Sequence, residues 1–235
     1  TAHAILQAEP YIKEDIFIIF GDTIFDGDID LETDGDGIIF VAETDDPKRF
    51  GIIELEGKYL KRIIEKPENP PTNLANIGMY YIKNSKDMFK YAQKLIDEDI
   101  KPLGEFCLTD AFQFMIEEGA KLESKKIEKW LDTGKIETTL ETNEYLLEKM
   151  EQPEGQGFKY PVFLGKDVIL ENSEIGPNVT LSDGCKVINS KLQHVIVDKN
   201  THIEDSEIEY ALIGKESKFK GFKGKGIFGD NTVKV

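Results

Sequence analysis

Apolar residues recur every six positions in the last third of the chain, at Phe163, Ile169, Ile175, Leu181 and Val187. This period is typical of a parallel β-helix, in which each short strand points one aliphatic side chain inward before the chain turns a corner. The register shifts near Gln193 and resumes with Val197 and Ile203. We therefore predict a short parallel β-helix here, with a β-sandwich as the alternative.

A continuous apolar run at residues 16–20 ends in Gly21 and Asp22. β-Branched and aromatic residues bounded by glycine predict a strand buried on both faces, as in a parallel sheet covered by helices. Asp22 then lies at the carboxyl end of this strand, where open α/β sheets bind their ligands. The alternative is that Asp22 only caps the turn that follows.

Strand-like and helix-like segments alternate as far as residue 150, which indicates an α/β domain with a mainly parallel sheet. Residues 151–157, Glu-Gln-Pro-Glu-Gly-Gln-Gly, have the composition of a linker. We therefore divide the chain into an α/β domain at residues 1–150, a linker at 151–160 and the β-helix at 161–235.

The composition excludes several classes of partner. The formal net charge is −16, so no broad basic field would attract nucleic acid or an anionic membrane. A small phosphorylated ligand remains compatible with a few local lysines. The two cysteines, Cys107 and Cys185, lack the spacing of a zinc site or a disulfide framework, and we expect a reduced, cytoplasmic protein. No apolar run reaches the roughly 18 residues of a membrane-spanning helix.

Two acidic residues, Asp22 and Asp132, stand where a predicted strand meets a turn. Mg²⁺ prefers oxygen ligands, is usually held by one or two carboxylates, and leaves its other positions to water and substrate phosphates. Lys66, at the end of another strand, could supply a second positive charge near a phosphate. Taken singly, these residues are also compatible with two turn-forming aspartates and a surface lysine.

Seven short motifs occur together in one order along the chain: Thr1-Ala2-His3-Ala4, Phe20-Gly21-Asp22, Phe50-Gly51, Glu65-Lys66-Pro67, Asn76-Ile77-Gly78-Met79-Tyr80, Gly104-Glu105 with Thr109-Asp110, and Trp130-Leu131-Asp132-Thr133-Gly134. Their order and spacing resemble the sugar-phosphate nucleotidyltransferases, most closely the glucose-1-phosphate thymidylyltransferase branch with a C-terminal left-handed β-helix. The resemblance implies a Rossmann-like nucleotide-diphospho-sugar transferase domain. It also implies transfer of a nucleotidyl group from dTTP or UTP to a sugar-1-phosphate, such as glucose-1-phosphate, with release of pyrophosphate.

The resemblance further implies a role for individual residues. It assigns Asp22 and Asp132 to Mg²⁺ and Lys66 to the phosphate of the sugar-1-phosphate. Other positions would bind the sugar or lie near the nucleotide base. The sugar positions are Gly51, Glu65, Asn76, Gly78 and Tyr80, and the base positions are Thr1 and His3.

Two departures from the family pattern concern the nucleotide. No Gly-x-Gly-Thr-Arg stretch, the loop that grips the triphosphate in this family, occurs in the sequence, and we expect that loop upstream of Thr1. Leu103 stands before Gly104-Glu105 where relatives often have an arginine. We therefore predict that residues 1–235 alone are inactive.

Two other functions remain as alternatives. A hexapeptide-repeat acyltransferase would use a histidine between coils, and His194 and His202 are available. A non-catalytic regulatory or scaffold relative would keep the fold alone. Because a stack of aliphatic coils with open ends suits subunit contacts, we also expect a homo-oligomer.

Overall fold

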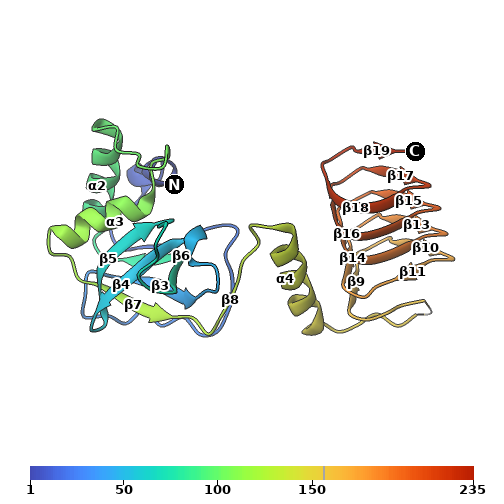
Figure 1. Ribbon diagram of the computed structural model, residues 1–235, viewed down its shortest axis with the longest axis horizontal. Coiled ribbons are helices and arrows are strands. Elements are labelled where there is room, and N and C mark those ends of the chain that lie inside the picture. Colours follow the sequence, from blue (N-terminus) through green and yellow to red (C-terminus); the bar gives the residue numbers. More distant parts are fainter. Residues whose placement is uncertain (156) are drawn as a thin grey trace. The chain divides into compact units, whose positions relative to one another are not determined.

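The structure is a computed structural model that describes residues 1–155 and 157–235 (Figure 1). These residues form two compact units, Thr1–Trp130 and Leu131–Val235. The helix that follows Asp132 belongs to the second unit, although the sequence pattern grouped it with the α/β domain.

The first unit is built on a six-stranded sheet with the order β1-β6-β3-β7-β5-β4. Among the strands of this sheet only β3 and β7 run parallel, and the other pairs are antiparallel. The α/β class is confirmed, but the sheet is mixed rather than mainly parallel. The reason is that β6 inserts between β1 and β3 in the opposite direction, and that β4 and β5 form a hairpin. The elements of this unit are α1 (Ala2–Leu6), β1 (Ile16–Ile19), β2 (Ile24–Asp26), β3 (Gly37–Glu43), β4 (Gly51–Glu56), β5 (Tyr59–Glu65), β6 (Leu74–Ile82), α2 (Lys86–Asp97), α3 (Leu108–Glu117), β7 (Leu122–Lys126) and β8 (Lys129–Leu131), with 3₁₀ turns at Glu9–Tyr11 and Pro47–Arg49.

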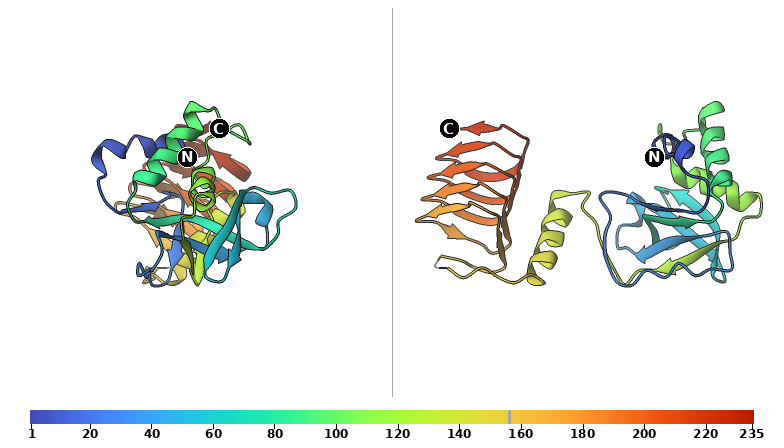
Figure 2. Two further views of the ribbon diagram at one scale, coloured as in Figure 1. Left: turned by 90° about the vertical axis from the view of Figure 1, so that its left-hand side faces the viewer. Right: turned by 180° about the vertical axis from the view of Figure 1, so that it is seen from behind.

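Helices α1, α2 and α3 gather on one side of this sheet (Figure 2). Their apolar faces bury Met88, Leu95 and Phe112 against Ile39 and Tyr80 of the sheet. A smaller cluster on the opposite face contains Ile38, Phe40, Ile77 and Met79, with Trp130 packed against it. The sheet therefore has apolar side chains on both faces, which is typical of an α/β domain.

The prediction that the first strand is buried on both faces is wrong. Burial alternates along β1: Ile16 and Ile18 are 8% exposed, whereas Phe17 and Ile19 are 38% and 44% exposed. The physical reason is that β1 lies at the edge of the sheet, where it pairs with β6 alone. The outward face is still partly apolar, because Phe17 packs edge-on against Phe40 at 6.2 Å.

The second unit begins with α4 (Ile136–Glu148) and continues as a parallel β-solenoid of about five turns, consistent with a left-handed β-helix. The strands stack into two sheets, β10-β13-β15-β17-β19 and β9-β12-β14-β16-β18 (Figure 1). Their bounds are β9 (Val162–Leu164), β10 (Ile169–Glu171), β11 (Glu174–Ile175), β12 (Val179–Leu181), β13 (Lys186–Ile188), β14 (Lys191–Val197), β15 (His202–Glu204), β16 (Glu207–Ile213), β17 (Lys218–Lys220), β18 (Lys223–Phe228) and β19 (Val233–Lys234).

The repeat differs from the strict period of six. Lys186 pairs with His202, which pairs with Lys218, so one turn of the solenoid takes 16 residues there. Because three repeats of six residues make 18 and one turn takes 16, residues spaced six apart cannot all face the interior of the solenoid. Ile175, Leu181 and Val187 do point inward and are fully buried, but Phe163 is only partly buried and Ile169 is 47% exposed.

Corners of the solenoid are made by residues with positive φ. Asn172, Asn189 and Asp205 occupy one corner in successive turns with φ of 47°, 47° and 50°. Asparagine and aspartate tolerate this left-handed conformation because their side chains hydrogen-bond locally. Here the side chains also bond along the stack, from Asn172 Nδ2 to Asn189 Oδ1 at 3.0 Å and from Asn189 Nδ2 to Asp205 Oδ1 at 3.1 Å. None of the described helices, in either unit, is long and apolar enough to cross a membrane.

Candidate functional site

Four elements of the first unit meet at Gly51. A Cβ atom on Gly51 would lie 3.0 Å from Glu65 Oε2, 3.2 Å from Asn76 Nδ2 and 3.2 Å from Thr109 Cγ2. Thr109 Oγ1 also donates to Glu65 Oε2 at 3.0 Å. We call these four residues the Glu65 cluster. A side chain at residue 51 would crowd the carboxylate of Glu65, the amide of Asn76 and the methyl group of Thr109, which favours glycine here.

Strand pairing explains why the Glu65 cluster forms. Gly51 of β4 is the register partner of Glu65 on β5, and Ile52 pairs with Ala75 of β6, which brings Asn76 beside Gly51. The β3–β6 register shifts at this point, between Ile39 and Val41. Irregularities of this kind re-aim side chains near functional sites.

The Asp22 turn lies against the same strand. Thr23 N donates to Phe20 O at 3.0 Å, and Thr23 Oγ1 donates to Ile77 O of β6 at 2.7 Å. Phe20 N donates to Gly78 O at 2.9 Å, and Asn76 Oδ1 accepts the N–H of Gly78 at 2.9 Å. The exposed Asp22 is therefore held by a turn that is linked through Gly78 to Asn76.

Gly78 is required by both its backbone and its surroundings. Its φ is +73°, and a Cβ there would lie 2.7 Å from Cδ2 of Phe20. The close approach of Phe20 therefore leaves no room for a side chain at this position.

Tyr80 lies beneath the Glu65 cluster rather than on its surface. The residue is fully buried, and its ring packs between Phe20 and Phe112 at centroid distances of 5.7 and 4.8 Å. Burial raises the pKa of its hydroxyl far above the usual range, with a smaller contribution from the negative charge of Glu65. The resemblance predicted that Tyr80 lines the sugar pocket. Its full burial instead indicates that Tyr80 supports the Glu65 cluster from below.

Lys66, Thr1 and His3 are the remaining predicted site residues of the first unit. Lys66 directly follows Glu65, is exposed, has a φ of 42°, and its N–H donates to Phe50 O at 3.0 Å. Thr1 Oγ1 accepts the N–H of Leu108 at 2.8 Å, which places Thr1 at the start of the helix that carries Thr109. His3 is exposed on α1, and no described contact joins its ring to the cluster.

Asp132 belongs to the second unit, where it follows β8 and precedes α4. Its Oδ1 accepts the N–H of Gly134 at 3.0 Å, and its carbonyl accepts Thr142 Oγ1 at 3.1 Å. Within residues 1–155 and 157–235 no group of three or more His, Cys, Asp or Glu side chains could hold a metal ion. A Mg²⁺ ion held by one or two carboxylates and substrate phosphates needs no such group, and the carboxylates of Asp22 and Asp132 are each of the oxygen-donor type that Mg²⁺ prefers.

The sequence interpretation missed two residues beside the Glu65 cluster. Burial and then the negative charge of Glu65 raise the pKa of the Asp110 carboxyl. The same two causes, in the same order, raise the pKa of the Cys107 thiol to about 11. The Thr109-Asp110 motif was the available signal for Asp110, but no role was assigned to it.

A scan of protein families matches residues 1–149 to the family described as "Nucleotidyl transferase". The chain belongs to this family. The match covers the first unit and reaches α4 of the second.

Similar proteins refine the comparison. The chain is 31% identical to a glucose-1-phosphate thymidylyltransferase of Streptomyces antibioticus, over 94% of this chain and 66% of the relative. It is 33% identical to a bifunctional protein GlmU of Methanococcus aeolicus, over 98% of this chain and 59% of the relative. The chain thus spans about three fifths of the length of these curated relatives.

A solved structure from Bacillus anthracis, described as a glucose-1-phosphate thymidylyltransferase in complex with sucrose, has a similar fold. Its TM-score is 0.52 at 23% identity, and the match covers 66% of this chain and 63% of that one. This likeness supports the fold alone.

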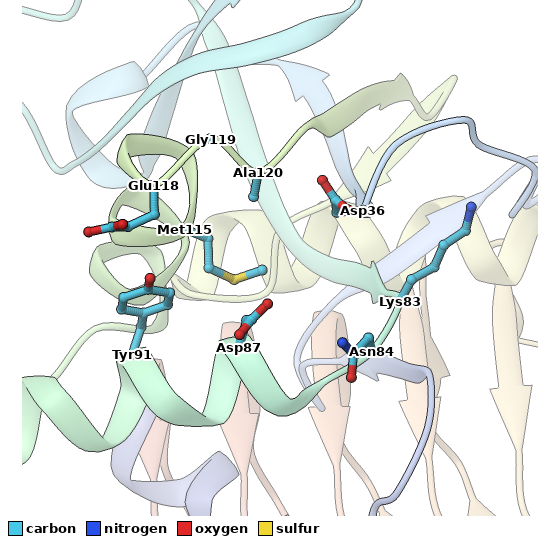
Figure 3. A pocket seen from close by; sticks show the side chains of 9 residues that line it. All are labelled: Asp36, Lys83, Asn84, Asp87, Tyr91, Met115, Glu118, Gly119 and Ala120. Atoms are coloured by element: carbon cyan, nitrogen blue, oxygen red, sulfur yellow. The ribbon is translucent and has the colours of Figure 1, made fainter.

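A separate hollow of about 360 Å³ lies between α2, α3 and the end of β6 (Figure 3). Its lining includes Lys83, Asp87, Tyr91, Met115 and Glu118, and none of the predicted site residues. The amine of Lys83 is engaged by Thr33 O at 2.5 Å. This hollow is therefore distinct from the Glu65 cluster.

The histidines proposed for an acyltransferase occupy ordinary positions in the solenoid. The ring of His194 stacks on Tyr210 of the next turn at 4.8 Å with an interplanar angle of 8°. His202 lies on β15 between Lys186 and Lys218 of the neighbouring turns. In the described part of the chain, no observation at either histidine favours acyl transfer.

Proposed function

We propose that this chain is part of an enzyme that transfers a nucleotidyl group to a sugar-1-phosphate. A phosphate oxygen of the sugar-1-phosphate attacks the α-phosphorus of a nucleoside triphosphate, the bond between the α-phosphorus and the bridging oxygen breaks, and pyrophosphate leaves. The Glu65 cluster carries the proposal, because a carboxylate, an amide and a hydroxyl converge above a glycine floor. Such a set accepts and donates hydrogen bonds, as recognition of a polyhydroxylated ligand requires.

Each residue has a proposed role. Glu65, Asn76 and Thr109 bind sugar hydroxyls above the Gly51 backbone, with Gly78 and Tyr80 shaping the floor. The ammonium of Lys66 binds the phosphate next to the sugar and neutralises its charge. Thr1 and His3 are proposed to lie near the base. No covalent intermediate is needed, because positioning and charge neutralisation suffice for in-line phosphoryl chemistry.

The proposed metal ligands are Asp22 and Asp132. When bound, Mg²⁺ would neutralise charge on the triphosphate during attack. The contribution of this chain is to present a carboxylate at each of two turns: one turn is fixed by Phe20 and Thr23, the other by Gly134 and Thr142.

The proposed substrates are glucose-1-phosphate with dTTP, and with UTP as the nearest competitor. The thymidylyltransferase from Streptomyces antibioticus supports this choice at 31% identity. We further propose a cytoplasmic homo-oligomer. Free Cys107 and Cys185 are compatible with a reducing compartment, and the exposed Ile227 and Val233 of the last solenoid turn offer apolar contact surface.

The test is pyrophosphate release by the full-length protein with a panel of nucleoside triphosphates and sugar-1-phosphates. We expect glucose-1-phosphate with dTTP or UTP to give the highest kcat/KM, and Asp22→Asn and Asp132→Asn each to lower kcat by about 100-fold or more. Residues 1–235 assayed in parallel should release no pyrophosphate. Unchanged rates in both aspartate variants would refute the metal assignment, and an inactive full-length protein would favour the scaffold alternative.

A further inference from the structure

The turn that carries Asp132 is closed by one hydrogen bond of its own and is fastened to α4 by two more. Gly134 N donates to Asp132 Oδ1 at 3.0 Å, and Thr142 Oγ1 donates to Asp132 O at 3.1 Å. Thr139 Oγ1 donates to Thr133 O at 3.0 Å. The orientation of the Asp132 carboxylate therefore depends on where α4 lies within this unit.

Helix α4 is in turn fastened to the solenoid by an amide pair. Asn143 Nδ2 donates to Asn178 Oδ1 at 2.6 Å, and Asn178 Nδ2 donates to Leu140 O at 2.8 Å. Thr180 Oγ1 donates to Asn143 Oδ1 at 2.7 Å. Because Asn178 is only 1% exposed, its amide has no ready replacement by water, and loss of these bonds would leave buried polar groups on α4 unsatisfied.

The two fastenings use consecutive residues of the same helix. Thr142 holds the carbonyl of Asp132, and Asn143 holds the amide of Asn178. A continuous route of short hydrogen bonds and one helical turn thus joins a solenoid corner to the Asp132 turn. Asn178 makes that corner with a φ of 54°, a conformation that asparagine and glycine adopt more readily than other residues.

We infer that the solenoid corner at Asn178 and Thr180 is a positioning element for Asp132, which makes the solenoid a part of the metal-binding machinery as well as a structural extension. The inference rests on the proposed role of Asp132 as a metal ligand. Residues behind the ligands of a metal site commonly tune its affinity through such hydrogen bonds.

The test compares two glycine substitutions in the full-length protein. Asn178→Gly removes the amide but keeps a residue that tolerates positive φ. Asn189→Gly is the matched control, since Asn189 makes another solenoid corner with a φ of 47° and its amide bonds Asp205 rather than α4. Thr180→Val is a milder second variant that removes only the hydroxyl bonded to Asn143. Circular dichroism verifies that all three variants are folded.

The first readout is hydrogen exchange of the Gly134 amide, which donates to Asp132. We expect it to accelerate about 10-fold in Asn178→Gly and about threefold in Thr180→Val, and to stay within about twofold of the parent in Asn189→Gly. The second readout is binding of Mn²⁺, a Mg²⁺ substitute visible by electron paramagnetic resonance, in the presence of nucleoside triphosphate. Its dissociation constant should rise about five- to 10-fold in Asn178→Gly.

The outcomes separate this inference from the proposed function. Equal Gly134 exchange and equal Mn²⁺ affinity in Asn178→Gly and Asn189→Gly would overturn the positioning role. Unchanged Mn²⁺ affinity in Asp132→Asn would instead refute the assignment of Asp132 to the metal. In that case accelerated Gly134 exchange would support the mechanical link alone, and the claim that the link serves a metal would fall with the assignment.

Discussion

The two units of the molecule bury polar groups in opposite ways. In the first unit, Glu65, Asn76 and Thr109 come from three different elements and converge on one glycine. In the solenoid, buried hydroxyls repeat once a turn. Ser190 Oγ accepts Ser206 N at 3.0 Å, and Ser206 Oγ accepts Phe222 N at 3.0 Å.

From this difference we assign substrate specificity to the Glu65 cluster and stability to the solenoid hydroxyls. Each solenoid hydroxyl satisfies a backbone group of the next turn, and the same bond recurs along the stack, so stability is spread over many similar interfaces. The Glu65 cluster has no repeat in the described part of the chain. We therefore expect single changes in the cluster to affect activity more than stability, and single changes in the serine ladder to do the reverse.

Among the substitutions that test this contrast between the two units, Glu65→Gln should have the largest effect, and that effect is on activity. The substitution keeps the volume and removes the charge that accepts the Thr109 hydroxyl at 3.0 Å. Loss of a charge-assisted hydrogen bond to substrate should cost about 2–3 kcal/mol in the transition state, or roughly 30- to 150-fold in kcat/KM. Steady-state kinetics of the full-length protein measure it.

The control for this prediction is Glu68→Gln, which removes an exposed carboxylate three residues away. It should leave kcat/KM within about twofold, as expected for a solvent-screened surface charge. If Glu65→Gln instead lowers the melting temperature by several degrees and leaves kcat/KM intact, the cluster is structural and the contrast between the two units is lost.

The next effect is on stability, from Gly78→Ala, which tests how tightly the Asp22 turn is docked. The new Cβ would meet Phe20 Cδ2 at 2.7 Å in a backbone with φ of +73°. Strain and overpacking together should lower the free energy of unfolding by about 3 kcal/mol.

Gly57→Ala is the matched control for Gly78→Ala. Gly57 has a similar φ of +64°, but a Cβ added there would have no atom within 4 Å, so only backbone strain of about 1 kcal/mol is expected. Urea unfolding of both variants measures the difference. Equal losses would show that Phe20 yields easily and that the turn is not held by crowding.

A smaller effect is expected in the solenoid from Ser206→Ala. The change removes the bond from Ser206 Oγ to Glu204 O at 2.7 Å and leaves the N–H of Phe222 without its acceptor. We expect a loss of about 1–2 kcal/mol in the free energy of unfolding and an unchanged kcat/KM. A fall in kcat/KM comparable to that of Glu65→Gln would show that the ladder, too, serves the reaction.

Local secondary structure and the order of the elements along the chain were predicted better than the pairing of the strands. The strand at residues 16–20 and the change of pattern after residue 150 were recognisable because their signals are local. The direction of β6 was not recognisable, because it depends on which distant strand pairs with β6. For the same reason β1 was expected in the middle of a sheet, and its exposed Phe17 and Ile19 show the edge.

The site was predictable only in part. The motifs named all four residues of the Glu65 cluster, but Thr109 had no assigned role until its hydroxyl was found to donate to Glu65. The solenoid core was foreseen by period, but a turn of 16 residues moves the inward positions away from Phe163 and Ile169. Neither the burial of Tyr80 nor the contact of Asn178 with α4 has a signature in the sequence, because each depends on packing between distant segments.

The smallest expected effect concerns Asp110, which lies beside the Glu65 cluster in the first turn of α3. Burial and the charge of Glu65 raise the pKa of its carboxyl in the folded state above the usual 3.8. The folded state therefore binds this proton more tightly than the unfolded state, and the carboxyl lowers stability progressively as pH rises from 3.8 through the folded-state pKa. Asp110→Asn should match the parent in melting temperature near pH 3.5 and exceed it by about 1–2 °C at pH 7, a small gain because the α3 dipole favours the carboxylate.

Asp87→Asn, in the first turn of α2 and exposed, should gain nothing, since it loses the dipole contribution without relief from burial. Thermal unfolding between pH 3.5 and 7 distinguishes the two variants. If Asp110→Asn is less stable than the parent at pH 7, the Asp110 carboxylate stabilises the fold, as the solenoid hydroxyls do. The idea that the carboxylate lowers stability beside the Glu65 cluster would then be wrong.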